Sequence, residues 1–131
     1  MFSYKRTIHL RETDSTGVLF FSELLNLGLE ALEAYFLTRG FTLKQLIEEG
    51  KFLMPIVHAE ADFSAPIYVG DQVEIELKVE KLGNSSFTMG TRIHRKGLEL
   101  GVTKIVHVVI SRETNRSIPL PEWLIRHLHS L

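Results

Sequence analysis

The segment from Ser22 to about Thr38 constrains the fold more than any other part of this chain. Its charged and amide side chains recur at spacings of three, four and three residues, the periodicity of one narrow stripe along an α-helix. These residues are Glu23, Asn26, Glu30 and Glu33. The other positions are apolar or small, which predicts a helix buried on more than one side, as if a sheet wraps it. Ser22 is placed to cap the N-terminus of this helix.

Most of the remaining chain has the two-residue periodicity of β-strands. The alternating segments are residues 3–11, 57–67, 73–80, 87–93 and 101–111. The last of them is apolar on both faces, which predicts a strand in the centre of the sheet. The sequence LGNSS, residues 82–86, predicts a hairpin turn, and residues 95–97 predict a second one.

The order of these elements predicts an α+β domain: a strand, one long buried helix, and then four strands in an antiparallel meander. Residues 43–49 add a short helical stretch, and residues 122–131 form an amphipathic tail that we expect to fray. With 131 residues and no repeat or low-complexity linker, residues 1–131 are expected to form one domain.

Composition narrows the classes of function. The chain has no cysteine, which excludes disulfides, thiolate zinc sites and a cysteine nucleophile. Its formal net charge of -1 lacks the basic excess that drives binding to phosphate backbones, so no nucleic acid is expected as a partner. Polar residues interrupt the most apolar stretch, residues 19–37, and no secretion signal precedes it. We therefore expect no membrane partner and a cytoplasmic location.

The segment RETDSTGVLFF, residues 11–21, is the most informative about chemistry. It sets Asp14 in a polar turn that ends where the buried helix begins. A helix N-terminus carries free N–H groups and partial positive charge, so the amides near Phe21 and Ser22 are suited to hold an oxyanion. An ionised aspartate beside them suits acyl transfer, as nucleophile or as general base for water. The alternative is that Asp14 only caps a turn, together with Ser15, Thr16 and Gly17.

These residues resemble the D-x-D-x-x-G-x-V-x-F/Y signature of hotdog-fold acyl-CoA thioesterases of the 4-hydroxybenzoyl-CoA thioesterase family, with Glu12 where the first aspartate often stands. A second stretch, MPIVHAEADFSAPIYVGD at residues 54–71, is similar to a segment of the 1,4-dihydroxy-2-naphthoyl-CoA thioesterase subgroup. The resemblance covers essentially the whole chain. It implies a five-stranded antiparallel sheet wrapped around one long helix, and hydrolysis of an aromatic acyl-CoA to free acid and coenzyme A.

The resemblance also assigns roles to single residues. Asp14 takes the place of the catalytic carboxylate, and the Phe21 backbone N–H takes that of the oxyanion donor. Gly17 and Glu30 match family positions and are assigned to substrate binding, although Glu30 suits a solvent-facing or interface role equally well. His58 lies on the polar side of its strand, where it suits a hydrogen bond to a ring hydroxyl or, equally, to a neighbouring strand or subunit.

Coenzyme A is part of the substrate, so no separate cofactor is expected. No metal is expected either, because the best-spaced histidines, His127 and His129, lie in the tail. Some relatives place basic residues at the hairpin turn where the phosphates of coenzyme A lie, whereas this chain has Gly83, Asn84 and two serines there. The candidates for phosphate contacts are then Lys81, Arg92, Arg95 and Lys96.

Two other functions are consistent with the sequence. One is a non-catalytic acyl or small-molecule binding module on the same fold, and the other is a thioesterase for short-chain aliphatic acyl-CoA. A hydratase or dehydratase is disfavoured because no acid is paired with His58 at a recognisable spacing. Edge strands of a small sheet need a partner or protection, so we expect a homo-oligomer. The family resemblance implies a dimer or tetramer with sheets joined edge to edge.

Overall fold

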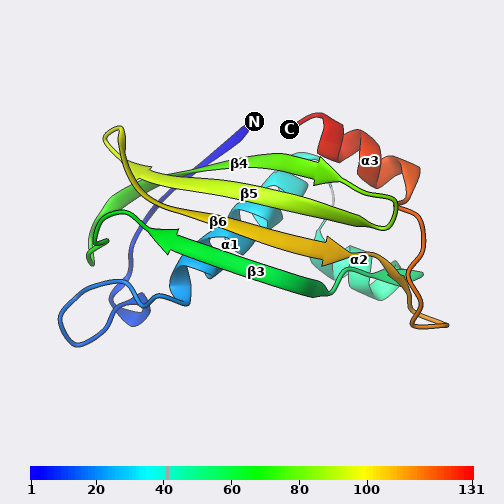
Figure 1. Ribbon diagram of the computed structural model, residues 1–131, viewed down its shortest axis with the longest axis horizontal. Coiled ribbons are helices and arrows are strands. Elements are labelled where there is room, and N and C mark those ends of the chain that lie inside the picture. The colour runs from blue at the N-terminus through cyan, green and yellow to red at the C-terminus, as the bar shows by residue number, and fades with distance from the viewer. Residues whose placement is uncertain (41) are drawn as a thin grey trace.

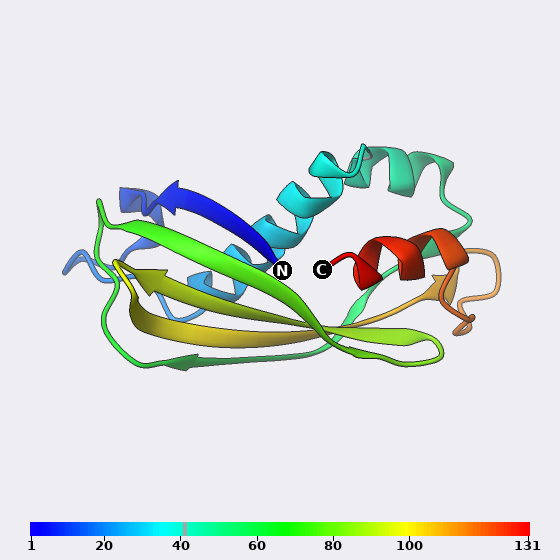
Figure 2. The same cartoon turned by 90° about the horizontal axis from the view of Figure 1, so that it is seen from above.

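One antiparallel sheet curves along one long helix in this protein (Figures 1 and 2). The computed structural model describes residues 1–40 and 42–131, and for Glu49 the backbone alone. The elements are β1 (Phe2–Thr7), a 3-10 turn (Leu10–Glu12), α1 (Glu23–Thr38), α2 (Leu43–Glu49), β2 (Phe52–Leu53), β3 (Ile56–Phe63), β4 (Gln72–Leu82), β5 (Ser86–Arg95), β6 (Leu98–Val108), β7 (Ile110–Ser111) and α3 (Glu122–His129). This arrangement confirms the predicted α+β class, with five strands in the main sheet.

The strand order of the sheet is β1-β4-β5-β6-β3, and every neighbouring pair is antiparallel. The apolar strand β6 lies inside the sheet, as predicted. The four-strand meander was wrong for β3, because β3 pairs with β6 and leaves β4 to pair with β1. Residues 64–71 carry the chain across the end of the sheet between β3 and β4. Periodicity locates strands along the chain, whereas their neighbours depend on such connections.

The strand predicted over residues 57–67 ends at Phe63. The Leu100 carbonyl accepts hydrogen bonds from the N–H groups of Ser64 and Ala65, at 2.8 and 3.2 Å, and Pro66 cannot extend the ladder. Ile67 is fully buried, but in the crossing segment rather than in the sheet. The alternation continues past the strand because the crossing segment still buries one side chain.

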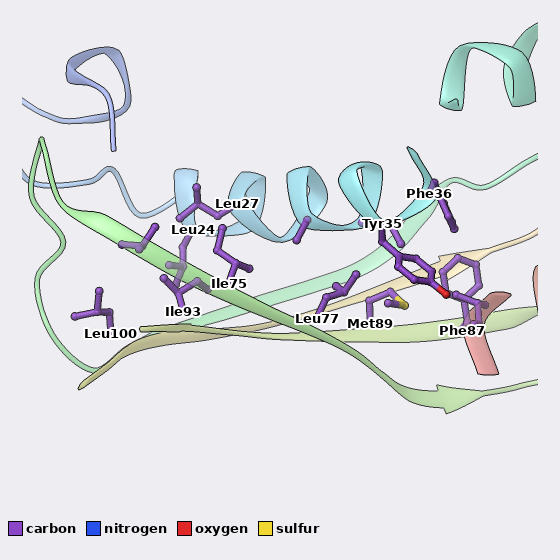
Figure 3. Packing of buried hydrophobic residues seen from close by; sticks show 14 of the residues in the cluster. Leu24, Leu27, Tyr35, Phe36, Ile75, Leu77, Phe87, Met89, Ile93 and Leu100 are labelled. Atoms are coloured by element: carbon purple, nitrogen blue, oxygen red, sulfur yellow. The ribbon is translucent and has the colours of Figure 1, made fainter. Parts of the chain in front are cut away.

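Helix α1 buries one face, so the prediction of burial on more than one side was wrong. The buried positions recur at spacings of one, three and four residues and are Leu24, Leu27, Gly28, Ala31, Leu32, Tyr35 and Phe36. Figure 3 shows this face above Ile75, Leu77, Met89 and Ile93 of the sheet. A single concave sheet covers only one side of a cylinder, so Leu29 stays half-buried and Leu37 exposed.

Gly28 lets the helix approach the sheet closely. A Cβ atom there would lie 3.0 Å from Thr103 Oγ1 and 3.4 Å from Thr91 Cγ2. Both threonines are buried, and their hydroxyl groups are hydrogen-bonded to each other, so the polar atoms beneath the helix are satisfied. The close approach fixes the height of α1 over β5 and β6.

The C-terminal tail is docked on the core, so the prediction that it frays was wrong. Leu124 and Leu128 of α3 are buried in the core, and the Tyr35 hydroxyl donates to the His127 carbonyl. The N-terminal ammonium donates to the Leu131 carbonyl at 2.8 Å, so the two chain ends meet, as Figure 2 shows. Among the described helices, none is long and apolar enough to cross a bilayer.

Candidate active site

Asp14 opens a tight loop whose arms are joined by backbone hydrogen bonds. The Asp14 N–H donates to the Val18 carbonyl at 2.8 Å, and the Gly17 N–H donates to the Asp14 carbonyl at 3.0 Å. Gly17 has a φ of 79°, a left-handed conformation that glycine adopts without steric cost. The structure thus gives Gly17 a role in shaping the loop, and its assignment to substrate binding stays a prediction.

The Asp14 carboxylate is held at one oxygen and open at the other. Oδ1 accepts hydrogen bonds from Thr16 Oγ1 at 2.5 Å, Thr16 N at 2.8 Å and Val18 N at 3.2 Å. Within the described residues Oδ2 accepts none. These hydrogen bonds hold the pKa of Asp14 below its ordinary value of 3.8, and the bond from the Thr16 hydroxyl has the largest effect. Asp14 therefore caps the turn with one oxygen while the other remains available, so the two interpretations of this residue are compatible.

The chain entering α1 leaves two backbone N–H groups without an acceptor. The Phe20 N–H donates to the Glu12 carbonyl and the Glu23 N–H to the Phe20 carbonyl, both at 3.0 Å. Between them, the N–H groups of Phe21 and Ser22 find no backbone acceptor in the described part of the chain. The predicted Ser22 cap was wrong, because Ser22 has helical dihedral angles and its side chain makes no capping bond. The uncapped end keeps its donors and its partial positive charge for an anion.

Among the described residues, no hydrogen bond joins Asp14 to the Phe21 amide. Asp14 opens the loop on one side of the bridge between Thr13 and Leu19, and Phe21 lies on the other side of that bridge. The Phe21 side chain is 78% exposed, so this end of α1 is open to solvent. A substrate thioester would have to lie between the two groups, with its carbonyl carbon facing Asp14 and its carbonyl oxygen facing the Phe21 N–H. The role of the Phe21 N–H as oxyanion donor stays a prediction.

A buried ion-pair network lies at the base of the loop. Arg6 of β1 contacts Glu12 through Nη2 and donates from Nη1 to both carboxylate oxygens of Glu30, at 2.6 and 2.7 Å. The side chains of Arg6 and Glu12 are 9% and 3% exposed, and that of Glu30 is 33% exposed. Glu12 Oε1 also accepts from the His9 N–H at 2.8 Å. Both oxygens of Glu30 are thus engaged by Arg6, which gives this residue a structural role, and its assignment to substrate binding stays a prediction.

His58 lies on the exposed edge strand β3. Its side chain is 58% exposed, and Nε2 is 3.2 Å from Glu60 Oε1, so the prediction that no acid pairs with His58 was wrong. The outer edge of β3 has no strand partner in the described chain, and Ile56, Val57 and Phe63 present exposed apolar surface there. None of the described cavities is lined by His58. A contact between His58 and a ring hydroxyl would therefore need a second chain over this edge.

Two of the four basic candidates for coenzyme A phosphates are already paired. Arg92 Nη2 lies 2.8 Å from Glu99 Oε1, and Arg95 Nη1 lies 2.5 Å from Asp71 Oδ2. Lys81 and Lys96 are exposed. They stand at opposite ends of β5, a separation of about 30 Å at the rise of a strand, so they cannot grip the same phosphate.

Sequence reasoning missed an apolar cavity of about 550 Å³ between α1, α2 and the segment that leads into β3. Leu29, Leu32 and Phe52 contribute apolar walls, and Glu33 and His107 are the polar side chains that line it. His107 is 6% exposed and stacks on Phe87, with ring centroids 5.0 Å apart. The burial of His107 could have been predicted from the sequence, because His107 alternates with the buried residues Ile105 and Val109.

Comparison with known proteins identifies the family. Residues 8–128 match the thioesterase-like superfamily. A 1,4-dihydroxy-2-naphthoyl-CoA hydrolase of Synechococcus elongatus is 34% identical, over 94% of this chain and 91% of that protein. One of Rippkaea orientalis is 35% identical, over 99% of this chain and 96% of that protein. The crystal structure of a 1,4-dihydroxy-2-naphthoyl-CoA thioesterase from Synechocystis superposes with a TM-score of 0.92 at 29% identity, covering 99% of this chain and 96% of that one. The resemblance seen in the sequence is confirmed, and the chain belongs to the thioesterase-like superfamily, with the hotdog fold.

Proposed function

We propose that this protein hydrolyses an aromatic acyl-CoA thioester to the free acid and coenzyme A. The observation that carries the proposal is an ionised Asp14, held by its loop, in a chain similar along its whole length to 1,4-dihydroxy-2-naphthoyl-CoA hydrolases. The favoured acyl groups are hydroxylated rings of the dihydroxynaphthoyl or 4-hydroxybenzoyl type.

The geometry of Asp14 supports an attack on the thioester by the free oxygen, Oδ2. The carbonyl oxygen then gains negative charge, and we assign its stabilisation to the Phe21 N–H at the start of α1, which has no backbone acceptor among the described residues. Loss of coenzyme A as thiolate leaves a mixed anhydride, and water hydrolyses it to release the acid and regenerate Asp14. The alternative is that Asp14 takes a proton from water. Its lowered pKa keeps the carboxylate ionised, as both roles require.

The proposal includes a second copy of the chain, as a homodimer or a tetramer built from dimers. The edge of β3 offers unpaired backbone groups and exposed apolar side chains, which a copy of the same strand can cover. A two-fold axis at this edge pairs β3 with its copy in the antiparallel sense. The end of one β3 then faces the start of the other.

This pairing brings different parts of the two chains together. The first turn of α1 lies beside the end of β3, because Leu24 and the Asp62 carbonyl both lie within contact distance of Gly101. The apolar cavity lies at the start of β3, where Met54 and Pro55 line it. The two-fold pairing therefore supports an active site at the subunit boundary, with the α1 start of one copy opposite the cavity of the other.

Release of free coenzyme A from a panel of thioesters tests the function. The panel contains 1,4-dihydroxy-2-naphthoyl-CoA, 4-hydroxybenzoyl-CoA and butyryl-CoA, and we expect the aromatic substrates to be hydrolysed fastest. Asp14→Asn should lower kcat/KM by about 10²–10⁴. The matched control is Glu113→Gln, the same chemical change in an exposed turn, which should leave the rate unchanged. Binding without hydrolysis would indicate the non-catalytic module, and fastest turnover of butyryl-CoA would indicate the aliphatic thioesterase.

A further inference from the structure

His107, one of the residues that line the cavity between α1, α2 and the segment before β3, has a ring nitrogen that the fold leaves without a partner. Nε2 of His107 is buried and has no hydrogen-bond partner among the described residues. The other ring nitrogen, Nδ1, lies 3.3 Å from the Met54 carbonyl oxygen. A carbonyl oxygen can only accept, so the proton of the ring is on Nδ1.

This arrangement determines what Nε2 can bind. Burial lowers the pKa of His107 below its ordinary value of 6.5, an effect that the Met54 carbonyl opposes in part, so the ring is neutral at neutral pH. In a neutral imidazole with its proton on Nδ1, Nε2 is an acceptor. The Glu33 carboxylate, the other polar group of the cavity, is also an acceptor when ionised and cannot satisfy it. The missing partner is a hydrogen-bond donor.

We propose that this cavity receives the aromatic ring of the acyl group and that a ring hydroxyl donates a hydrogen bond to His107 Nε2. The inference rests on the proposed function, since it names the part of the substrate that the cavity holds. A volume of about 550 Å³ lies within the range of small-ligand sites, and apolar walls with a few polar groups are typical of them. His107, in place of His58, then distinguishes hydroxylated rings from unsubstituted ones.

The position of the cavity fits the two-fold assembly. Leu29, the cavity residue nearest the start of α1, is eight positions beyond Phe21, about 12 Å along a helix. A naphthoyl group is shorter than that, so a ring in the cavity does not place its thioester carbonyl at the Phe21 amide of the same chain. The paired copy brings its own α1 start to this end of β3. A ring bound in one chain is thus presented to the catalytic groups of the other.

Binding of two neutral probes to the full-length protein tests the role of His107 without catalysis. The probes are 1-naphthol, which carries a donor, and 1-methoxynaphthalene, which has similar size and no donor. Methionine methyl groups labelled with ¹³C report the location by NMR: the signal of Met54, in the cavity wall, should shift, and that of the exposed Met1 should not. We expect the wild type to bind 1-naphthol about tenfold more tightly than 1-methoxynaphthalene.

Two variants isolate the acceptor. His107→Phe keeps a ring to stack on Phe87 but has no acceptor, so the affinity ratio of the two probes should fall to about one. His107→Gln provides an amide oxygen and should restore part of the preference. In kinetics, His107→Phe should lower kcat/KM about tenfold on 1,4-dihydroxy-2-naphthoyl-CoA and leave it nearly unchanged on 2-naphthoyl-CoA. Circular dichroism checks the fold, and His107→Leu replaces the phenylalanine variant if that one does not fold.

The outcomes separate this inference from the proposed function. If His107→Phe retains the wild-type ratio of probe affinities, or if the Met54 signal does not move, the inference is overturned even though thioesters are hydrolysed. If no thioester is hydrolysed by the wild type but the preference for 1-naphthol depends on His107, the proposed function fails and the donor-selective cavity stands.

Discussion

Replacing Arg6 by methionine tests the ion-pair network at the base of the Asp14 loop. The change keeps an apolar stem but removes the positive charge from Glu12, whose side chain is 3% exposed. Removing one partner of a buried pair costs about 3–5 kcal/mol, because the remaining charge is left uncompensated. The contact with Glu30 adds about 1 kcal/mol or less, because a third of that side chain is exposed and water screens it. We expect Arg6→Met to lower the free energy of unfolding by about 3–6 kcal/mol in total.

Urea unfolding followed by circular dichroism measures this loss. The midpoint shift equals the loss of free energy divided by the m value, which is about 1–3 kcal/mol/M in urea for a small domain. The urea midpoint should therefore move by at least about 1 M, with an unchanged m value. A loss of this size is a large part of the about 5–15 kcal/mol by which such a domain is stable. The matched control is Arg92→Met, which breaks an exposed pair with Glu99 and should cost about 0–0.5 kcal/mol. Adding Glu12→Gln to Arg6→Met removes the stranded charge and should recover about 2 kcal/mol.

The double variant makes the interpretation refutable. If Arg6→Met lowers the free energy of unfolding no more than Arg92→Met does, water screens the charges of the network as it screens an exposed pair. If the effects of Arg6→Met and Glu12→Gln simply add, the two side chains do not interact and the loop is supported by other contacts.

Three more measurements test the site and the assembly. Phe21→Pro removes the proposed oxyanion donor and should raise the activation free energy of thioester hydrolysis by about 2.7–4 kcal/mol. Phe21→Leu keeps the N–H group and should change the rate only slightly. Turnover near the wild-type rate by a correctly folded proline variant would place the donor elsewhere. Below pH 6.5 the unfolded chain binds a proton that buried His107 does not, so the free energy of unfolding should fall as the pH falls, by up to about 1.4 kcal/mol per pH unit. His107→Phe should flatten this part of the profile measured by urea unfolding, and identical profiles would contradict the buried neutral imidazole. Light scattering should give a dimeric or larger mass, and Val57→Asp on the edge of β3 should yield monomers; a monomeric parent would contradict the proposed pairing.

Local chemistry in the sequence determined the elements and the Asp14 loop. Alternation and helical spacing depend on side chains close together in the chain, so they located the strands and α1 to within a few residues. The loop was also predictable, because an aspartate followed by Thr16 and Gly17 closes a turn through its own neighbours. Its likeness to a family signature then indicated the chemistry.

Tertiary structure alone decided which distant residues meet. Arg6 and Glu30 are 24 positions apart, and only the packing of α1 on the side of β1 brings them together in a partly buried ion pair. The exposure of His58 follows from the pairing of β3 with β6, which leaves its strand at the edge. His107 is buried because its ring stacks on Phe87 and the chain before β3 contacts its Nδ1 through the Met54 carbonyl. Burial and hydrogen bonding depend on neighbours supplied by the fold, and spacing along a chain does not record them.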